Sequence, residues 1–245
     1  MLLVSHEGRI GGAERSLLLL IQHLVQQGGM HVGLACPPGG PLAAEAGSLG
    51  CRIFPLSSRP RVGGISLIEA VKWIGLSMQV RRACVAFRPD IVHANSVYSM
   101  ALCWFLWPRG RTKVVWHVRD LPRRRAITRL CGRLSDRVIA VSGAVKERLL
   151  SQGLDGDSID VIHNGIEPPT ASMIDQRPSF IPFSDRNDGR IVFANVGQFV
   201  PWKKQTLFLA AAALVAPPSP SHRRLQLPTR WGHRSPVPAS RSPLH

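Results

Sequence analysis

The stretch HEGRIGGAERSLLLLIQHL, residues 6–24, follows the apolar run LLVSH and carries two adjacent glycines before a long apolar segment. From Leu17 to Val25 the apolar residues recur at the spacing of one helix face, while glutamines occupy the opposite face. The short apolar run before the glycines is typical of a buried strand. A strand that turns through a glycine-containing loop into a helix is the opening unit of an α/β fold.

Six further apolar runs follow, and segments with helical spacing separate them. Together with the first run they occupy residues 1–6, 31–37, 51–56, 90–96, 113–120, 137–143 and 159–165. Nearly continuous apolar strands that alternate with helices indicate a parallel sheet covered on both faces. We therefore predict a doubly wound, Rossmann-like α/β domain over residues 1–167.

The character of the chain changes after residue 167. Residues 168–189 are rich in Pro, Ser and Asp, which predicts a linker. Residues 190–216 carry the pattern of one strand and one helix, the start of a second α/β domain. Residues 217–245 hold seven prolines, five arginines and no acidic residue, a composition typical of disorder. One strand and one helix cannot form a domain, so we expect the second domain to be incomplete, as a reading-frame change near Ala216 would make it.

Composition argues against a disordered chain, a cysteine metal site and a membrane-spanning protein. The chain has 245 residues and is 44% hydrophobic, which excludes wholesale disorder. Its five scattered cysteines lack metal-ligand spacing and indicate free thiols in a reducing cytoplasm. The start of the chain lacks the pattern of a signal peptide, and polar residues interrupt the 18 uncharged residues between Asp90 and Arg109. We expect a cytoplasmic protein without a transmembrane helix.

The net charge of +16 favours an anionic partner, which could be nucleic acid, a nucleotide or an acidic lipid surface. The five arginines of residues 217–245 contribute part of that charge, and subtracting them leaves +11 for the rest of the chain. The basic character therefore does not depend on the end of the chain.

Gly11 and Gly12 lie where the first predicted helix presents its free N–H groups. A phosphate could approach the backbone there and meet the positive end of the helix dipole. Neither the G-x-G-x-x-G fingerprint nor the phosphate loop G-x-x-x-x-G-K-[ST] is present. From this loop alone, a tight turn from strand to helix explains the glycines equally well.

Six segments decide between these readings: GGAERSLLLLIQHL, PDIVHANS, VVWHVRD, RVIAVSGAVKERLLSQG, IDVIHNGIE and NVGQFVPWKKQTLFLAAA. In this order and at this spacing, over about residues 1–216, they resemble glycosyltransferase family 4, the retaining sugar-nucleotide transferases of GT-B fold. The resemblance implies two Rossmann-like domains that face each other across a cleft. It also implies transfer of a hexosyl-type group from a nucleotide-diphosphate sugar to a hydroxyl acceptor, with retention of configuration.

The resemblance assigns site residues as well. His117 corresponds to a histidine that contacts the transferred sugar, and we expect it to act through orientation and polarity together with the nearby Asp120. The alternative is a histidine hydrogen-bonded to a neighbouring strand. The residues expected at the acceptor are His93, Asn95, Ser96 and Arg119, and those expected at the donor phosphates are Gly11, Gly12, Gln198 and Lys203.

Two departures from the family bear on the donor site. The family often has arginine where this chain has Gln198, and its paired glutamates are absent, since the last acidic residue is Asp188. No metal or other cofactor is implied besides the donor, and we expect Lys203 and helix N-termini to meet the phosphate charge.

Other polar residues have simpler structural explanations. Glu14 suits the first turn of a helix, where the dipole favours a carboxylate. Ser142 is a candidate helix cap, and Asn164 with Gly165 is typical of a turn.

The segment LPRRRAITRLCGRLSDR, residues 121–137, combines two helical patterns. One is an apolar stripe of Ile127, Leu130, Cys131 and Leu134, and the other is a row of arginines at every fourth residue from Arg125. With the aromatics and arginines of residues 100–111, this pattern suits an anionic membrane surface at the inner face of the membrane. A solvated helix face over an ordinary core is the alternative.

The leading hypothesis is thus a glycosyltransferase whose acceptor is a sugar, a lipid-linked molecule or another hydroxyl compound. The alternatives are a catalytically inactive fragment that retains acceptor or membrane binding, and a related GT-B epimerase or phosphorylase. A nucleic-acid-binding protein is supported by charge alone, because the sequence shows no aromatic stacking platform and no binding module.

Overall fold

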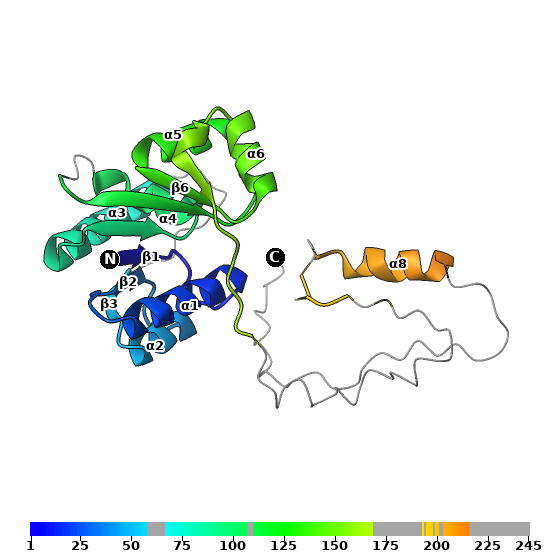
Figure 1. The fold of residues 1–245 in the computed structure, drawn as a ribbon, viewed down its shortest axis with the longest axis horizontal. Helices are drawn as coiled ribbons and strands as arrows, with labels where there is room; N and C mark the ends of the chain where they lie inside the picture. The colour runs from blue at the N-terminus through cyan, green and yellow to red at the C-terminus, as the bar shows by residue number, and fades with distance from the viewer. Residues whose placement is uncertain are drawn as a thin grey trace, which may run out of the picture. The chain divides into compact units, whose positions relative to one another are not determined.

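The computed structural model describes residues 1–57, 67–106, 110–168, 193, 195–197, 199–200 and 203–215 (Figure 1). The chain divides into two units, Met1–Pro168 and Pro169–His245.

The first unit alternates strands with helices along its whole length. Its strands are β1 Leu2–Val4, β2 Gly33–Cys36, β3 Arg52–Pro55, β4 Ile91–Ala94, β5 Lys113–Val118, β6 Arg137–Ala140 and β7 Ile159–Val161. Its helices are α1 Gly12–Gln26, α2 Pro41–Ser48, α3 Leu67–Phe87, α4 Val97–Leu102, α5 Arg125–Leu134 and α6 Gly143–Ser151, with short 3-10 turns η1 Trp104–Leu106 and η2 Gly156–Ser158.

The strands form one sheet in the order β3-β2-β1-β4-β5-β6-β7, and every neighbouring pair is parallel. All seven predicted strands are present, and the predicted doubly wound α/β class is confirmed. The strand order reverses direction between β1 and β4: from β1 the chain proceeds to β2 and β3 on one side, and from β4 it proceeds to β5, β6 and β7 on the other. Ligands of such sheets bind beyond the carboxyl ends of the strands at this point.

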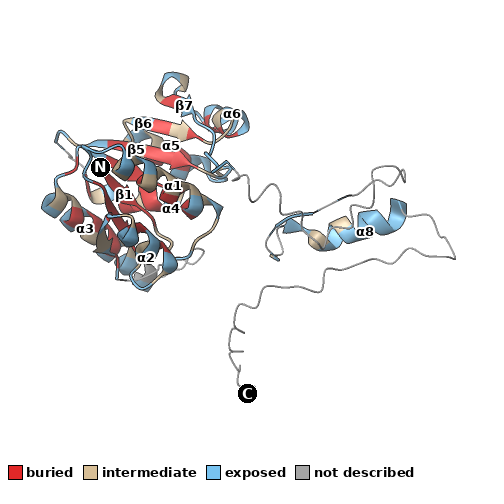
Figure 2. Ribbon diagram, turned by 60° about the horizontal axis from the view of Figure 1, so that its bottom comes forward, coloured by how far each residue is buried: buried red, intermediate tan, exposed pale blue. Residues whose placement is uncertain are grey.

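Side-chain alternation along the strands divides the core into two layers. Leu3 belongs with Leu17 and Leu34 to the layer under α1 and α2. Leu2 and Trp116 belong to the opposite layer, which packs against α3, α4, α5 and α6. Figure 2 shows the buried strands enclosed between these helices. Coverage on both faces explains why the strands are nearly continuous in apolar residues.

Two local features fix where helices begin. Ser142 accepts the Val145 N–H at 3.3 Å through its hydroxyl, which confirms its predicted capping role. At the start of α2, the backbone of Gly40 lies so close to Gly8 that an added Cβ would come within 2.3 Å of the Gly8 carbonyl oxygen. A larger residue at position 40 would therefore separate α2 from the loop after β1.

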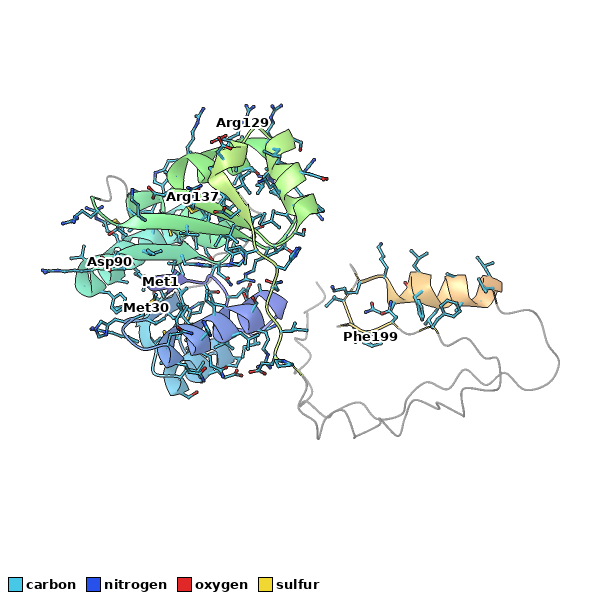
Figure 3. All side chains as sticks on the ribbon, viewed as in Figure 1. Met1, Met30, Asp90, Arg129, Arg137 and Phe199 are labelled. Atoms are coloured by element: carbon cyan, nitrogen blue, oxygen red, sulfur yellow. The ribbon has the colours of Figure 1, made fainter. Side chains whose placement is uncertain are left out.

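The predicted apolar stripe of α5 is divided in the structure. Cys131 is buried, whereas Ile127 and Leu130 are 39% and 36% exposed. Arg125 and Arg129 both donate from Nε to the Gln152 carbonyl, at 3.3 and 2.9 Å; Arg129 is labelled in Figure 3. Two of the three predicted surface arginines thus fasten α5 to the end of α6, because the last carbonyls of a helix lack intrahelical partners.

The five cysteines are free, as predicted. Among the residues that the structure describes, no helix combines the length and apolar character needed to cross a bilayer.

In the second unit the structure contains the helix α8, Gln205–Val215, at the predicted place, and none of its residues is buried. The described residues between 193 and 200 form no strand. The rest of that predicted strand, nearly all of the predicted linker 168–189 and the tail 217–245 lie outside the described residues, so the predicted domain plan beyond residue 168 stays a prediction.

Candidate functional site

The candidate site lies at the carboxyl ends of β1, β4 and β5, which are adjacent in the sheet. His93 pairs in register with Leu3 and Val115, and His117 lies two residues beyond Val115. Because side chains two residues apart in a strand share a face, both histidines lie on the α1 side of the sheet. The parallel register thus brings together two predicted site residues that are far apart in the sequence.

The two histidines form a buried pair. His117 Nδ1 and His93 Nε2 are 3.2 Å apart, and the rings meet edge to face with centroids 5.2 Å apart. Burial, together with the smaller effect of the Arg119 charge, lowers the pKa of His93 to about 4 and that of His117 to about 3. Both rings are therefore neutral near pH 7, and in the contact between them one ring nitrogen donates a hydrogen bond and the other accepts it.

His117 retains one nitrogen for another partner. The ring is 7% exposed, so it lies deeper than a histidine at an open edge would. Its Nε2 atom is buried and has no hydrogen-bond partner in the described part of the chain. The contact to the neighbouring strand, foreseen as an alternative, is made by Nδ1, and it leaves Nε2 free to bond an incoming group.

Arg119 crosses the site and joins three parts of the fold. Its Nε donates to Asn95 Oδ1 and its Nη1 donates to Asn164 Oδ1, both at 2.7 Å. Asn95 also donates to the Ala13 carbonyl at 3.5 Å, and Ser16 donates to Asn164 Oδ1 at 3.2 Å. Asn164, for which the sequence indicated only a turn, thus belongs to the site.

The charge of Arg119 is held in a fixed place. Burial lowers the pKa of Arg119 to about 10, while the carboxylates of Glu14 and Asp120 act in the opposite direction. The guanidinium therefore stays charged near pH 7. A fixed positive charge near a neutral histidine pair suits a polar substrate with a negative group.

Glu14 closes part of the helix N-terminus that was predicted to bind phosphate. Its Oε2 atom accepts the Gly11 N–H at 3.1 Å, and burial is the main cause that raises the pKa of its carboxyl group. The Gly11 N–H is therefore occupied by a carboxylate. A Cβ at Gly12 would meet open space, so an approaching ligand could still reach the backbone there.

Replacing Glu14 with alanine is expected to destabilise the chain by about 1 kcal/mol, because the Gly11 N–H loses its acceptor. Glu14→Gln retains an oxygen at the same place and should cost less. Urea denaturation of the two variants measures the difference. Equal costs for both would show that the contact to Gly11 contributes nothing.

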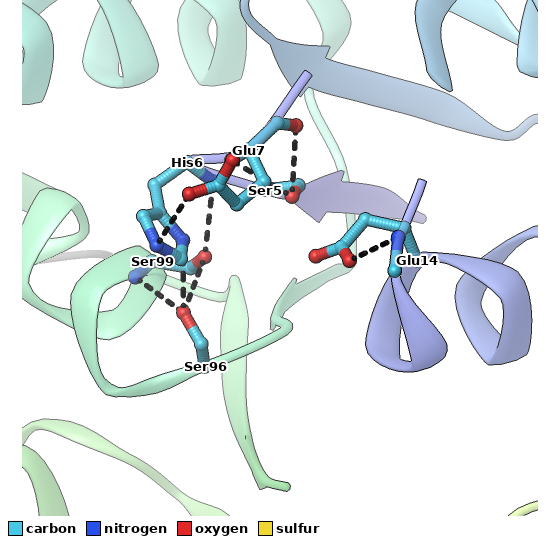
Figure 4. A network of polar contacts seen from close by, with 7 residues as sticks. Ser5, His6, Glu7, Glu14, Ser96 and Ser99 are labelled. Atoms are coloured by element: carbon cyan, nitrogen blue, oxygen red, sulfur yellow. Dashed lines mark hydrogen bonds and ion pairs between the residues drawn. The ribbon is translucent and has the colours of Figure 1, made fainter. Parts of the chain in front are cut away.

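Ser96, predicted at the acceptor, takes part in a network after β1 (Figure 4). Its hydroxyl accepts the Ser99 N–H at 3.1 Å and lies 3.0 Å from Ser99 Oγ and 3.2 Å from His6 Nδ1. His6 Nε2 in turn lies 3.7 Å from Glu7 Oε1. The network fastens the loop after β1 to the start of α4. The Ser96 hydroxyl, predicted to contact the acceptor, is thus already hydrogen-bonded to groups of the protein.

Asp120 faces a different region from His117. It lines a cavity of about 770 Å³ at the carboxyl ends of β5 and β6, together with Arg119 and residues of the following loop and of α6. His117 does not line this cavity. The structure therefore brings together His93, Asn95, His117 and Arg119 of the predicted site, and Arg119 connects that group to the cavity with Asp120.

Of the predicted donor residues in the second unit, Lys203 is exposed and precedes α8 by two residues, and its N–H donates to the Val200 carbonyl at 3.0 Å. Gln198 lies outside the described residues.

Asp155 and Asp157 stand at D-x-D spacing, and Asp155 accepts the Asp157 N–H at 3.3 Å as the cap of η2. Within the described ranges no three His, Cys, Asp or Glu side chains gather so as to hold a metal ion.

The family model for Glycosyltransferase Family 4 matches residues 10–169, which include the first-unit site residues named above except His6 and Glu7. No curated protein sequence matched the chain.

Solved structures show the same fold. Anabaena HepE, solved in complex with UDP and glucose, has 18% sequence identity and a TM-score of 0.53, over 68% of this chain and 44% of that one. The glycotransferase of kitacinnamycin has 16% identity and a TM-score of 0.50, over 73% of this chain and 55% of that one. The chain thus spans about half the length of these structures.

Proposed function

This chain belongs to glycosyltransferase family 4, and from that premise we propose that it transfers a hexosyl group from a nucleotide-diphosphate sugar to a hydroxyl acceptor with retention of configuration. The donor class is supported by the solved complexes of HepE with UDP and with UDP-glucose. The single observation that carries the proposal is the buried Nε2 of His117, which has no hydrogen-bond partner among the described residues, near the fixed charge of Arg119.

In this proposal His117 orients the sugar. A neutral imidazole can donate a hydrogen bond to a sugar hydroxyl or accept one from it. Because it carries no charge, it does not attract the donor phosphates away from their own site. His93 holds the ring through the contact at Nδ1, which makes it a positioning residue. Arg119 favours the negative charge that develops as the sugar leaves the diphosphate. No protein nucleophile is assigned.

For the donor phosphates we propose Lys203, Gln198 and the backbone at Gly12, without a metal ion. A lysine just before a helix N-terminus is disfavoured by the helix dipole, so a bound anion gives it a purpose. Gly11 contributes less than we expected, because Glu14 occupies its N–H group.

Calorimetric titration of the full chain with UDP, GDP and their sugar conjugates tests the donor site. We expect saturable binding that weakens about tenfold in Lys203→Ala, the loss of one charge-assisted contact. Lys204→Gly is the matched control, since Lys204 has a positive φ of 54° that glycine adopts readily. A folded chain that binds none of these nucleotides would be the inactive fragment considered above.

We also propose that the acceptor is met at an anionic membrane surface. Leu121, Ile127 and Leu130 are exposed next to Arg123 and Arg124. Exposed apolar residues with flanking arginines suit the boundary of acidic lipids.

Sedimentation with vesicles of phosphatidylglycerol and phosphatidylcholine tests this surface. We expect binding that falls about tenfold when Ile127 and Leu130 both become serine, because their apolar area no longer enters the lipid. Leu150→Ser, at an exposed leucine of α6, should leave binding unchanged. Equal binding of all three proteins, or binding to duplex DNA in preference to vesicles, would contradict the membrane proposal.

A further inference from the structure

The cavity at the carboxyl ends of β5 and β6 has a strongly basic lining. The loop from Arg119 to Arg123 forms one side of it. Ser142, Val145 and Arg148, spaced along one face of α6, form the other side. Three of the lining residues are arginines, and Asp120 is the one carboxylate among them. The cavity therefore carries an excess of positive charge.

Asp120 acts electrostatically on Arg119. The two residues are adjacent, and the Asp120 carboxylate raises the pKa of Arg119 against the effect of burial. Within the described part of the chain, no ion pair joins Arg123 or Arg148 to a carboxylate. Their two charges are thus left without a counter-charge from these residues.

Several hydrogen-bond donors remain available around the cavity. Arg148 donates from its Nε to the Pro122 carbonyl at 3.1 Å, and among the described residues its two terminal nitrogens have no hydrogen-bond partner. Arg123 is exposed and makes no hydrogen bond with the residues that the structure describes. Ser142 and Val145, at the start of α6, line the cavity; the Ser142 hydroxyl accepts the Val145 N–H, and the other N–H groups of this first turn have no intrahelical acceptor.

These features together fit a phosphate group. Guanidinium groups form paired, charge-assisted hydrogen bonds with phosphate oxygens, and N–H groups at a helix start add to them. The cavity volume of about 770 Å³ is in the range of small-molecule sites and exceeds the needs of a single ion. The apolar side chains of Leu121 and Val145 on its walls could pack against the face of a sugar ring.

We propose that this cavity binds a phosphate group on the acceptor, held by Arg123, Arg148 and the start of α6, so that the acceptor is a phosphorylated hydroxyl compound. This inference rests on the proposed transferase function. The phosphate can belong to a soluble phosphate ester or to the headgroup of a phospholipid.

Binding of the acceptor phosphate is measured without donor, on the full chain. Glucose 6-phosphate is titrated by calorimetry, with glucose as its uncharged counterpart. Vesicles that contain phosphatidic acid are compared with vesicles of phosphatidylcholine. The variants are Arg123→Gln, Arg148→Gln and the control Arg133→Gln, an exposed arginine of α5 that does not line the cavity. Circular dichroism verifies the fold of each variant, and Arg123→Gln is the safer test because Arg123 makes no hydrogen bond or ion pair with the described residues.

We expect saturable binding of one phosphate source, weakened about tenfold by each cavity substitution and unchanged by Arg133→Gln. If the cavity substitutions weaken the binding of glucose 6-phosphate, the acceptor is a soluble phosphate ester. If they weaken the binding of phosphatidic acid vesicles, the acceptor is a lipid. Binding of neither source, or equal weakening by Arg133→Gln, would overturn the proposal. Because no nucleotide is present, these outcomes are separate from failure of the donor titration.

Discussion

Lowering the pH from 7 to 5 is expected to reduce the free energy of unfolding by about 2–4 kcal/mol through His93 and His117 alone, at about 1.4 kcal/mol for each histidine and pH unit below its ordinary pKa. Burial lowers the pKa of the two rings from 6.5 to about 4 and about 3. Below pH 6.5 the unfolded chain therefore binds protons that the folded chain refuses. The stability is present above pH 6.5 and is lost as the pH falls toward 4.

Urea denaturation at pH 7 and pH 5 measures this loss. His117→Gln should remove about half of the difference between the two pH values, and His31→Gln, at an exposed position, should retain all of it. Glu14 acts in the opposite direction, because its raised pKa favours proton uptake by the folded chain. The histidine contribution is therefore obtained by comparing variants. An unchanged pH dependence in His117→Gln would show that the pair is not buried in its neutral form.

The second large effect concerns sugar transfer. His117→Ala is expected to lower kcat/KM about 100-fold, the usual cost of removing one oriented hydrogen-bonding group from a transition state. Binding of the bare nucleotide should stay within a factor of about two, because His117 is proposed to contact the sugar. Steady-state transfer rates and nucleotide titrations on the same preparation separate these two quantities.

His93→Gln provides the comparison for that variant. His93 touches only the Nδ1 side of His117, so its loss should lower kcat/KM less than the loss of His117 itself. Residual activity of His117→Ala within about threefold of the unsubstituted chain would contradict a role for His117 at the sugar. A larger loss in His93→Gln than in His117→Ala would reverse the assignment of the two rings.

The sequence predicts the fold well because the signals that specify it are local. Alternation of apolar runs with helical spacing indicates all seven strands of the sheet, and the parallel class follows from strands that are apolar on both faces. The cap at Ser142 follows from the same local chemistry, since a hydroxyl just before a helix satisfies a free N–H group.

The site depends on long-range geometry that periodicity does not contain. His93 and His117 are 24 residues apart, and Arg119 and Asn164 are 45 residues apart, so only the register of the sheet brings them into contact. Neighbouring elements likewise determine that both histidine rings are buried and that His117 Nε2 has no hydrogen-bond partner among the described residues. The exposure of single residues on α5 depends on the same kind of long-range contact: Arg125 and Arg129 bond to Gln152, whereas Ile127 and Leu130 remain partly exposed.

The most direct test of the central claim is a nitrogen-15 spectrum of the histidine rings, recorded while UDP-glucose or another UDP- or GDP-sugar is added to the full chain. The account predicts that one nucleotide sugar shifts the Nε2 signal of His117 saturably, with a smaller change at His93, and that the bare nucleotide does not. A folded chain in which no nucleotide sugar moves the His117 signal would contradict the proposal that this ring receives the donor sugar.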